Sequence, residues 1–367
     1  MEAIKERYQR QIILPELGQE GQNLLSEAKV LVIGAGGLGC PVLQYLVVSG
    51  VGHIGIADDD VVQLSNLNRQ ILFGPQDVGL YKVDVAKEKL LLLNESVSIQ
   101  VWKKRWSTQD CITHFKEYDI IVDATDNFTS RYLINDACVL FNKPLVFGAV
   151  SKFEGQLAVF NWGNKEKSVN YRDVFTVPPQ SNEILNCAEA GVLGVLPGMI
   201  GVLQATEVIK LITGIGKPLA NKLLTYNALQ QEFFTIQLKH NPEAKPLIPA
   251  TVEEFKNTDY EWLCNLNQEH ETEIDCEKWL EIQDNTVVVD VRELNETPRL
   301  NAYNPFEIPI ADLKENRDRL SEKTLVFVCQ SGKRSLLAVK IMLEYNPKAQ
   351  VFSLKGGVNE MIRKNLI

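Results

Sequence analysis

A glycine-rich segment near the N-terminus constrains the fold more than any other feature of the chain. Residues 34–39 read GAGGLG, directly after the apolar run AKVLVI and directly before CPVLQYLVV, whose apolar residues have helical spacing. Glycines allow a tight turn between a strand and a helix, and they let the backbone approach phosphate groups at the helix N-terminus. Asp58 ends the next apolar run, at the spacing expected of an acid that binds a ribose. The segment predicts a Rossmann-like nucleotide-binding domain and leaves the nucleotide open.

Strand-like and helix-like runs alternate along the rest of the chain. The strand-like runs GHIGIADDD, VSIQVWKKRW and YDIIVDATDN are separated by helix-like runs such as DVGLYKVDVAKEKLLLLN. This alternation predicts an α/β fold, a mainly parallel sheet covered by helices on both faces. A proline-bearing polar segment indicates a linker, after which the alternation restarts on a smaller scale. We expect a Rossmann-like domain over 1–240, a linker over 241–272 and a small α/β domain over 273–367.

Composition indicates a soluble protein of two or three domains. The 367 residues are 45% hydrophobic and 23% charged, with a net charge of −9. That charge argues against nucleic-acid binding, which usually needs a basic surface. The start MEAIKERYQRQ has no apolar signal region, and the seven cysteines are scattered, so we expect reduced thiols in the cytoplasm. The apolar stretch 191–205 is too short for a membrane span and contains Pro197, which predicts a buried helix instead of membrane contact.

A second set of residues distinguishes ATP from a dinucleotide. The set consists of Ser65, Asn66, Arg69, Lys82, Asp126 and Asn127. Two cations and a carboxylate at the C-terminal edge of a sheet suit a triphosphate and its Mg²⁺. Hydride transfer needs no cations there. Unrelated surface charges explain any one of these residues, but they explain the whole set poorly, so ATP is favoured as a reactant over NAD or FAD as a cofactor.

Several motifs together resemble the ThiF/MoeB/HesA family, bacterial relatives of ubiquitin-activating enzymes. They are RYQRQIILPELGQEGQNLL, VLVIGAGGLGCPVLQYLVVSGVGHIGIADDD, SNLNRQ, VDATDNFTSRYLIND, EGQLAVF and CAEAGVLGVLPGMIGVLQATEVIKLI, over about residues 6–240. The resemblance implies adenylation of the C-terminal glycine of a ubiquitin-like sulfur carrier that ends in Gly-Gly. The reaction would use ATP and Mg²⁺ and release pyrophosphate.

The resemblance also implies roles for individual residues. The residues that would bind the nucleotide are Gly37, Asp58 on the ribose, Asn66, Arg69 and Lys82 on the phosphates, and Asp126 on Mg²⁺. Arg10, in RYQRQ, resembles an arginine that family members extend across a homodimer into the partner's site. We therefore expect a homodimer in which Arg10 acts in trans.

The chain departs from the family pattern at a structural zinc site. Many members carry two C-x-x-C pairs, which would fall at NYRD (170–173) and near KHNPEAKPL (239–247). Both segments lack cysteine, and no cysteine occurs between Cys187 and Cys264. Because stray ligands cannot complete a tetrahedral site, we expect no zinc.

Of two cysteines in this region, one has two possible roles and the other is expected only to pack. Cys187, in ILNCAEAG, aligns with a cysteine that some relatives use to form a thioester or acyl disulfide with the carrier. A small apolar residue that only packs is an equally good interpretation. Cys40 follows the glycine loop and is interpreted as a packing residue.

The C-terminal part resembles a rhodanese, or sulfurtransferase, domain over about 273–367. The matching segments are VVVDVRE (287–293) and LVFVCQSGKRS (325–335). Cys329 would carry a persulfide, because loop N–H groups, a helix N-terminus, Lys333 and Arg334 should favour its thiolate. The C-x4-R spacing is shorter than the H-C-x5-R loop of tyrosine phosphatases and suits sulfur better. We expect Asp290 and Arg292 to brace this loop from the neighbouring strand.

The chain is thus interpreted as an adenylyltransferase fused to a sulfurtransferase. The persulfide donor would be of the cysteine desulfurase type, and the product a carrier thiocarboxylate for molybdopterin, thiamine or thiolated tRNA. Two alternatives stay open. One is a dinucleotide-dependent oxidoreductase, and the other is a non-enzymatic carrier-binding scaffold with an inactive rhodanese domain.

Overall fold

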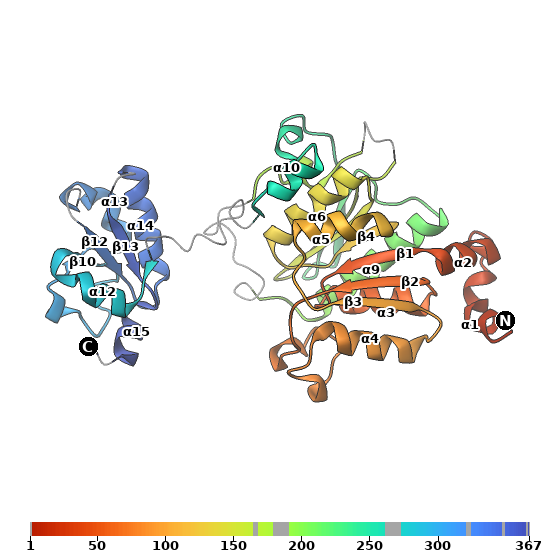
Figure 1. Cartoon of the computed structure of the whole chain (residues 1–367), viewed down its shortest axis with the longest axis horizontal. Coiled ribbons are helices and arrows are strands. Elements are labelled where there is room, and N and C mark those ends of the chain that lie inside the picture. Colours follow the sequence, from red (N-terminus) through yellow and green to blue (C-terminus); the bar gives the residue numbers. More distant parts are fainter. Residues whose placement is uncertain are drawn as a thin grey trace. The chain divides into compact units, whose positions relative to one another are not determined.

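The chain forms two compact units, Met1–Asn265 and Leu266–Ile367 (Figure 1). The structure is a computed structural model that describes residues 2–163, 168–178, 191–260, 273–320, 324–346, 349–364 and 366. Cys187, the candidate for a covalent carrier intermediate, lies outside the described residues.

An eight-stranded sheet forms the centre of the first unit. Its strands are β1 Lys29–Ile33, β2 His53–Ala57, β3 Ser98–Trp102, β4 Ile120–Asp123, β5 Leu145–Ser151, β6 Glu154–Phe160, β7 Lys222–Asn227 and β8 Glu232–Gln237. They follow the order β3-β2-β1-β4-β5-β6-β7-β8. The strands from β3 to β5 pair parallel, and those from β5 to β8 pair antiparallel. The parallel half confirms the expected Rossmann-like arrangement.

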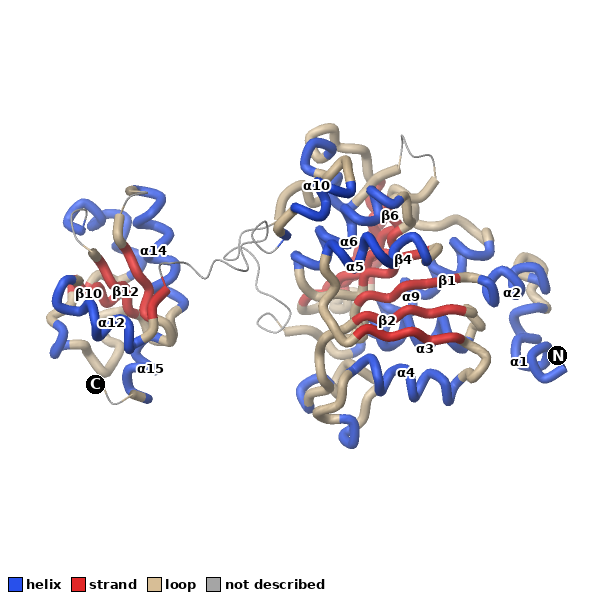
Figure 2. Tube along the Cα trace, in the orientation of Figure 1, coloured by secondary structure: helices blue, strands red, loops and turns tan. Residues whose placement is uncertain are grey.

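Helices cover both faces of this sheet (Figure 2). They are α1 Glu2–Ile12, α2 Gly18–Glu27, α3 Gly39–Val48, α4 Lys82–Leu93, α5 Thr108–His114, α6 Phe128–Phe141, α7 Tyr171–Val174, α9 Val195–Thr213 and α10 Val252–Asn257, with 3-10 turns at Leu64–Asn66, Pro75–Asp77, Phe115–Glu117 and Lys245–Leu247. Alternate residues of β1 enter two cores, because successive side chains of a strand point to opposite faces. Val30 and Val32 pack in one core, and Leu31 and Ile33 pack in the other.

Helix α9 is long and apolar enough to cross a membrane by length and composition alone. Its burial gives a simpler account of that composition. It packs on α3, β5 and β6, and Leu196 and Ile200 belong to the core beside Val30. This arrangement agrees with the buried helix expected from the sequence.

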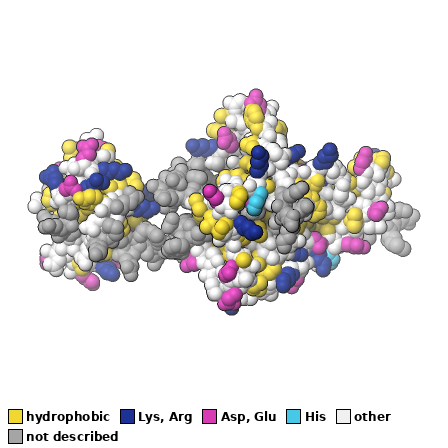
Figure 3. All heavy atoms as spheres, turned by 90° about the horizontal axis from the view of Figure 1, so that it is seen from above, with side chains coloured by type: hydrophobic (Ala, Val, Ile, Leu, Met, Phe, Trp, Pro, Cys, Tyr) yellow, Lys and Arg dark blue, Asp and Glu magenta, His cyan; other side chains and the backbone are white. Residues whose placement is uncertain are grey.

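The described surface mixes apolar and charged groups. Three apolar side chains of β8 are about half exposed, Phe233 at 52%, Phe234 at 56% and Ile236 at 51%. On the face drawn in Figure 3, acidic and basic side chains are interspersed among apolar and neutral ones. Charges of both signs in this arrangement do not build a strong field of one sign over that face.

The second unit is a smaller α/β unit with a five-stranded parallel sheet. Its strands are β9 Glu273–Ile274, β10 Val287–Asp290, β11 Phe306–Glu307, β12 Leu325–Val328 and β13 Val351–Leu354, in the order β11-β10-β12-β13-β9. Its helices are α12 Cys276–Ile282, α13 Leu313–Asn316, α14 Lys333–Tyr345 and α15 Gly357–Arg363, with 3-10 turns at Gln283–Asn285, Asn301–Tyr303, Ile310–Asp312 and Arg317–Leu320. Two buried clusters flank the sheet, so both faces are covered.

Part of the segment expected as a linker belongs to the first unit. Helix α10 packs on α5 and α6, and its Phe255 is fully buried. Tyr260 donates a hydrogen bond of 2.9 Å to Asp136 Oδ2 on α6. Arg172 of α7 donates two more bonds to the same carboxylate, at 2.8 and 2.7 Å. Apolar and hydrogen-bonding contacts therefore hold residues up to 260 on the first unit, although their composition suggested a linker.

The buried pair of Asp136 and Arg172 generates a stability prediction. We expect Asp136→Ala to lower the free energy of unfolding by about 3–5 kcal/mol, because it leaves a buried guanidinium without its counter-charge. Tyr260→Phe removes one hydroxyl and should cost about 1 kcal/mol. Urea unfolding of the full chain, followed by circular dichroism, measures both. Equal small effects of the two substitutions would contradict the role of the ion pair.

Candidate functional site

The glycine loop joins β1 to α3 and requires close backbone contacts. Gly34 has a φ of +100°, and a Cβ there would lie 2.5 Å from the carbonyl oxygen of Ala124. A Cβ on Gly39 would lie 2.0 Å from the carbonyl oxygen of Gly34. Side chains at either position would force the loop away from the end of β4. The glycines thus bring the α3 N-terminus and the end of β4 to one edge of the sheet.

Asp58 holds this loop from the end of β2. Its Oδ2 accepts a hydrogen bond of 2.7 Å from the backbone N–H of Ala35, and its Oδ1 accepts one of 2.9 Å from the backbone N–H of Asp60. Burial raises the pKa of the Asp58 carboxyl, and the charge of Lys82 partly opposes that shift. The carboxylate therefore sits against the loop, at the position expected for a ribose ligand.

The two candidate phosphate-binding cations are held by residues of their own chain. Lys82 is buried, with 4% exposure, and its Nζ lies 2.6 Å from Asp60 Oδ2. Arg69 donates from one nitrogen to the carbonyl oxygen of Ser65 at 3.0 Å and to Asn68 Oδ1 at 3.1 Å. Both cations are thus oriented by contacts within the chain. The Cγ of Arg69 also lies 3.5 Å from the position of a Cβ on Gly37, which brings SNLNRQ beside the glycine loop.

Asn66 and the pair Asp126–Asn127 have different surroundings. Asn66 is buried, and its Oδ1 accepts a hydrogen bond of 3.1 Å from the N–H of Gln63, which shapes the turn that carries Arg69. Asp126 is exposed, directly beyond β4. Asn127 caps α6 by accepting a hydrogen bond of 2.9 Å from the N–H of Ser130. Asp126 is accordingly available to a ligand, whereas Asn66 and Asn127 also support local structure.

Sequence reasoning missed two residues of this site. Asp60 pairs with Lys82, and Arg105 donates a hydrogen bond of 3.1 Å to Asn127 Oδ1. Asp60 lies in the run DDD at 58–60, and Arg105 lies in the basic run WKKRW at the end of β3. Both runs come at the end of a parallel strand, at the sheet edge that carries the glycine loop, and this position could have indicated both residues.

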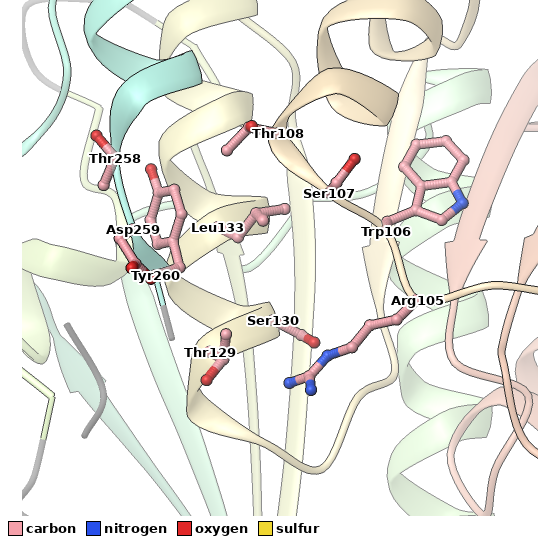
Figure 4. Close-up of a pocket in the computed structure, with 10 residues that line it drawn as sticks. All are labelled: Arg105, Trp106, Ser107, Thr108, Thr129, Ser130, Leu133, Thr258, Asp259 and Tyr260. Carbon is pink, nitrogen blue, oxygen red and sulfur yellow. The ribbon is translucent and has the colours of Figure 1, made fainter. Parts of the chain in front are cut away.

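A cavity of about 420 Å³ opens beside the N-terminus of α6 (Figure 4). It is lined by Arg105, Trp106, Ser107, Thr108, Thr129, Ser130, Leu133, Thr258, Asp259 and Tyr260. Figure 4 shows Arg105 extending across the start of α6 toward Ser130. None of the sequence-predicted nucleotide ligands lines the cavity, and Arg105 connects it to Asn127.

Arg10 is not brought to the site within one chain. It lies exposed in the last turn of α1, and the neighbouring Tyr8 packs against Gly50, just past the end of α3. The glycine loop is at the other end of α3. A ten-residue helix is about 15 Å long, which separates α1 from the loop of the same chain.

Cys40 is a core residue, as expected. It is fully buried, and burial raises the pKa of its thiol to about 12. The thiol therefore stays protonated at neutral pH and is a poor nucleophile.

A buried aspartate joins the two segments in which the sequence shows no cysteine pairs. Asp173 of NYRD accepts hydrogen bonds at Oδ2 from the backbone and side-chain nitrogens of Asn170, at 2.8 and 2.7 Å. Its Oδ1 accepts one of 2.8 Å from the N–H of Asn241 and lies 2.9 Å from His240 Nδ1. The two segments that lack the cysteine pairs are therefore joined by one carboxylate. One carboxylate with amide and imidazole partners does not match a structural zinc site built from four cysteine thiolates.

In the second unit, Cys329 lies between β12 and α14. It is buried, with 1% exposure, below a loop that ends at Gly332. A Cβ on Gly357 would lie 2.0 Å from the carbonyl oxygen of Cys329. The turn before α15 therefore packs directly on the loop, a contact that sequence reasoning did not predict.

Arg292 braces this loop, which confirms the expectation. Its Nε and one terminal nitrogen donate to Asp290 at 3.0 and 2.8 Å, and both side chains are fully buried. Its other terminal nitrogen donates to Gln330 Oε1 at 3.1 Å. The ion pair thus holds Arg292 where it bonds Gln330, the first residue after Cys329.

Arg334 has a partner that the sequence did not indicate. It forms a two-bond pair with Glu296, at 2.6 and 2.7 Å, and its charge also interacts with Cys329. The guanidinium lowers the pKa of Glu296 from 4.5 to about 2. The pair therefore stabilises the fold above the ordinary carboxyl pKa and is lost as the pH falls toward 2.

The chain is similar to known proteins over most of its length. The model of the ThiF family matches residues 8–247. The fold of this region is similar to that of Escherichia coli MccB, with a TM-score of 0.58 and 24% identity over 65% of this chain and 71% of that one.

Curated relatives match between 71% and 91% of the chain. A sulfur carrier protein adenylyltransferase of Thermus thermophilus is 46% identical over 71% of this chain and 97% of its own. The probable adenylyltransferase/sulfurtransferase MoeZ of Mycobacterium tuberculosis is 39% identical over 91% of this chain and 88% of its own. The adenylyltransferase and sulfurtransferase MOCS3 of Culex quinquefasciatus is 38% identical over 91% of this chain and 81% of its own. The chain therefore belongs to the ThiF family and is an adenylyltransferase.

Proposed function

We propose that the chain adenylates the C-terminal Gly-Gly of a ubiquitin-like sulfur carrier with ATP and Mg²⁺, and that its second unit supplies persulfide sulfur from Cys329. The observation that carries the proposal is the convergence of Asp58, Arg69 and Lys82 on the glycine loop at one edge of the parallel sheet. The names of relatives that match 71% to 91% of the chain add support. The product would be a thiocarboxylate for molybdopterin synthesis, with thiamine synthesis and tRNA thiolation as alternatives.

The first step needs charge compensation more than acid–base catalysis. A carboxylate oxygen of the carrier's last glycine attacks the α-phosphorus of ATP, and the electron pair of the broken P–O bond leaves with pyrophosphate. The attacking carboxylate is already ionised at neutral pH. Lys82 and Arg69 would contact the phosphates and offset the charge that builds there. Mg²⁺, held through Asp126, would neutralise part of the triphosphate charge.

Asp126 provides the first test. We expect Asp126→Ala to lower carrier-dependent ATP–pyrophosphate exchange about a hundredfold or more, because the metal loses its carboxylate. The matched control is Asp119→Ala, an exposed aspartate just before the other end of β4, which should exchange like the wild type. Exchange by Asp126→Ala within twofold of the control would remove Asp126 from the site.

We also propose a homodimer in which Arg10 enters the partner's site. Its support is the separation of α1 from the glycine loop within one chain.

Mixing two inactive variants tests the trans role of Arg10. A dimer of one Arg10→Ala chain and one Asp126→Ala chain has one intact site, so random mixing should restore about a quarter of wild-type exchange. Wild-type protein mixed with the double variant serves as the reference for subunit exchange. Mixed dimers that form and show no recovery would contradict the trans role.

Sulfur transfer would follow adenylation. The outer sulfur of the Cys329 persulfide attacks the acyl carbon of the carrier adenylate, and AMP leaves with the electron pair of the C–O bond. A thiol then attacks Cys329 Sγ and expels the carrier thiocarboxylate. That thiol is either Cys187 or an external thiol.

Cys329→Ala separates the two activities. ATP–pyrophosphate exchange should persist, because no residue of the second unit is among the nucleotide ligands. Thiocarboxylate formation from a persulfide donor should stop, because alanine holds no sulfur. Cys276→Ala, at another buried cysteine of the same unit, is the control. Intact mass of the carrier, which gains about 16 Da when sulfur replaces oxygen, reads the result. A full yield from Cys329→Ala would overturn the sulfur-transfer proposal, and loss of yield on Cys187→Ala would identify Cys187 as the thiol that attacks Cys329.

We further propose that no structural zinc is present and that Asp173 supplies the rigidity instead. Metal analysis of the purified chain should find no stoichiometric zinc, and a chelator should leave the thermal midpoint unchanged. Asp173→Ala should lower the free energy of unfolding by about 1–3 kcal/mol, because it leaves buried donors unpaired. Asp84→Ala, in the exposed pair with Lys103, should cost less than about 0.5 kcal/mol. One zinc per chain would refute the proposal.

The carrier itself can be identified directly. A pull-down with the full chain and ATP, read by intact mass, should recover a small protein that ends in Gly-Gly and carries AMP or sulfur.

A further inference from the structure

We infer that Ser335 and Ser353 form a buried hydroxyl pair that binds the reacting sulfur of Cys329 and stabilises its ionised form. The inference rests on the proposed sulfur transfer by Cys329 and adds two residues to it.

The geometry links three side chains from different elements. Cys329 Sγ lies 3.5 Å from Ser335 Oγ, in the first turn of α14. Ser353, on β13, donates a hydrogen bond of 2.9 Å to the same oxygen. Ser335 donates one of 2.8 Å to the carbonyl oxygen of Gly332. Both serines are fully buried, so water does not readily replace either hydroxyl.

The hydroxyl protons of the two serines can rearrange when the Cys329 thiol ionises. A serine hydroxyl has one proton and two acceptor positions. In the thiol state, Ser335 accepts from Ser353 and from the Cys329 S–H, and it donates to Gly332. When the thiol loses its proton, the Ser335 proton can turn to the sulfur. The Gly332 carbonyl then keeps the hydrogen bond of 3.2 Å from the N–H of Leu336, so no acceptor is left unpaired.

Ser353 limits the directions in which the Ser335 hydroxyl proton can point. Its hydrogen bond occupies one lone pair of Ser335, which leaves the Ser335 proton only two partners, Gly332 and the sulfur. A hydrogen bond to an anion is stronger than one to a neutral group, and more so away from water. Ser335 therefore contacts the reacting atom, and Ser353 is a positioning residue that acts through it.

The reaction that draws on this pair is the loading of Cys329. With thiosulfate as the probe, Cys–S⁻ attacks the outer sulfur, the S–S bond of thiosulfate breaks, and sulfite leaves with the electron pair. The balance is Cys–S⁻ + S₂O₃²⁻ → Cys–S–S⁻ + SO₃²⁻. Only the ionised cysteine attacks thiosulfate. Where Cys329 is only partly ionised, the rate of loading is therefore proportional to its ionised fraction.

Other charges near the loop remain unchanged in the serine variants. They are Arg334 with Glu296, Arg292 with Asp290, Lys333 at the start of α14, Lys355 after β13, and Glu360 on α15. A difference between wild type and a serine variant therefore reports on the hydroxyls.

The experiment compares Ser335→Ala, Ser353→Ala and a control in the full chain. The control is Thr324→Ala, which removes a hydroxyl bonded to Gln350 at the opposite end of β12. Ultraviolet absorbance of the thiolate against pH, with the Cys329→Ala signal subtracted, gives the ionisation midpoint. Sulfite release from thiosulfate gives the rate of loading. Thermal unfolding confirms that each variant is folded.

We expect the midpoint of Ser335→Ala to rise by about one pH unit and its neutral-pH loading rate to fall about tenfold, the loss of one charged hydrogen bond. Ser353→Ala should shift the midpoint in the same direction by less, and Thr324→Ala should match the wild type. Ser335→Ala with a wild-type midpoint would overturn the inference. Loading absent from the wild type itself would instead overturn the sulfur-transfer proposal, while the absorbance titration would still test the hydroxyl pair.

Discussion

The close approach of backbone segments at the end of β1 is the constraint on which the first unit depends. Gly34 touches the end of β4, and Gly39 folds back on Gly34, so no side chain separates the start of α3 from the sheet. This contact places helix N–H groups, the Asp58 carboxylate and Asp126 along one edge. A larger residue at either glycine would separate the nucleotide ligands from one another, even if every ligand were retained.

The second unit has the same arrangement of strand, loop and helix but different chemistry. A buried strand, a short loop and a helix N-terminus again meet at the C-terminal edge of a parallel sheet, here around Cys329. Gly357 lets a second turn reach the loop, as the glycines do around β1. In the first unit the edge would hold phosphates, and in the second it holds a sulfur. Each unit positions its reactive groups by backbone geometry and supports them with buried polar side chains.

Supporting residues were harder to predict than ligands. Asp60, Arg105 and Asp173 each act through a partner distant in the chain, Lys82, Asn127 and His240 respectively. A single sequence carries no record of such pairs, since any exposed acid or base resembles them. Arg334 is a further example. Its position after Cys329 suggested a role toward sulfur, but its hydrogen-bonded pair with Glu296 on another loop was not predictable.

The sequence by itself determined the α/β class, the glycine loop, the choice of candidate ligands and the rhodanese-like loop, because these depend on local spacing and on residue types that few other structures require. Tertiary structure alone decided where the first unit ends, since Tyr260 reaches Asp136 across more than a hundred residues. It also decided what replaces the cysteine pairs and which hydroxyls lie under Cys329. Those features depend on long-range packing, which brings together side chains whose individual sequence contexts are unremarkable.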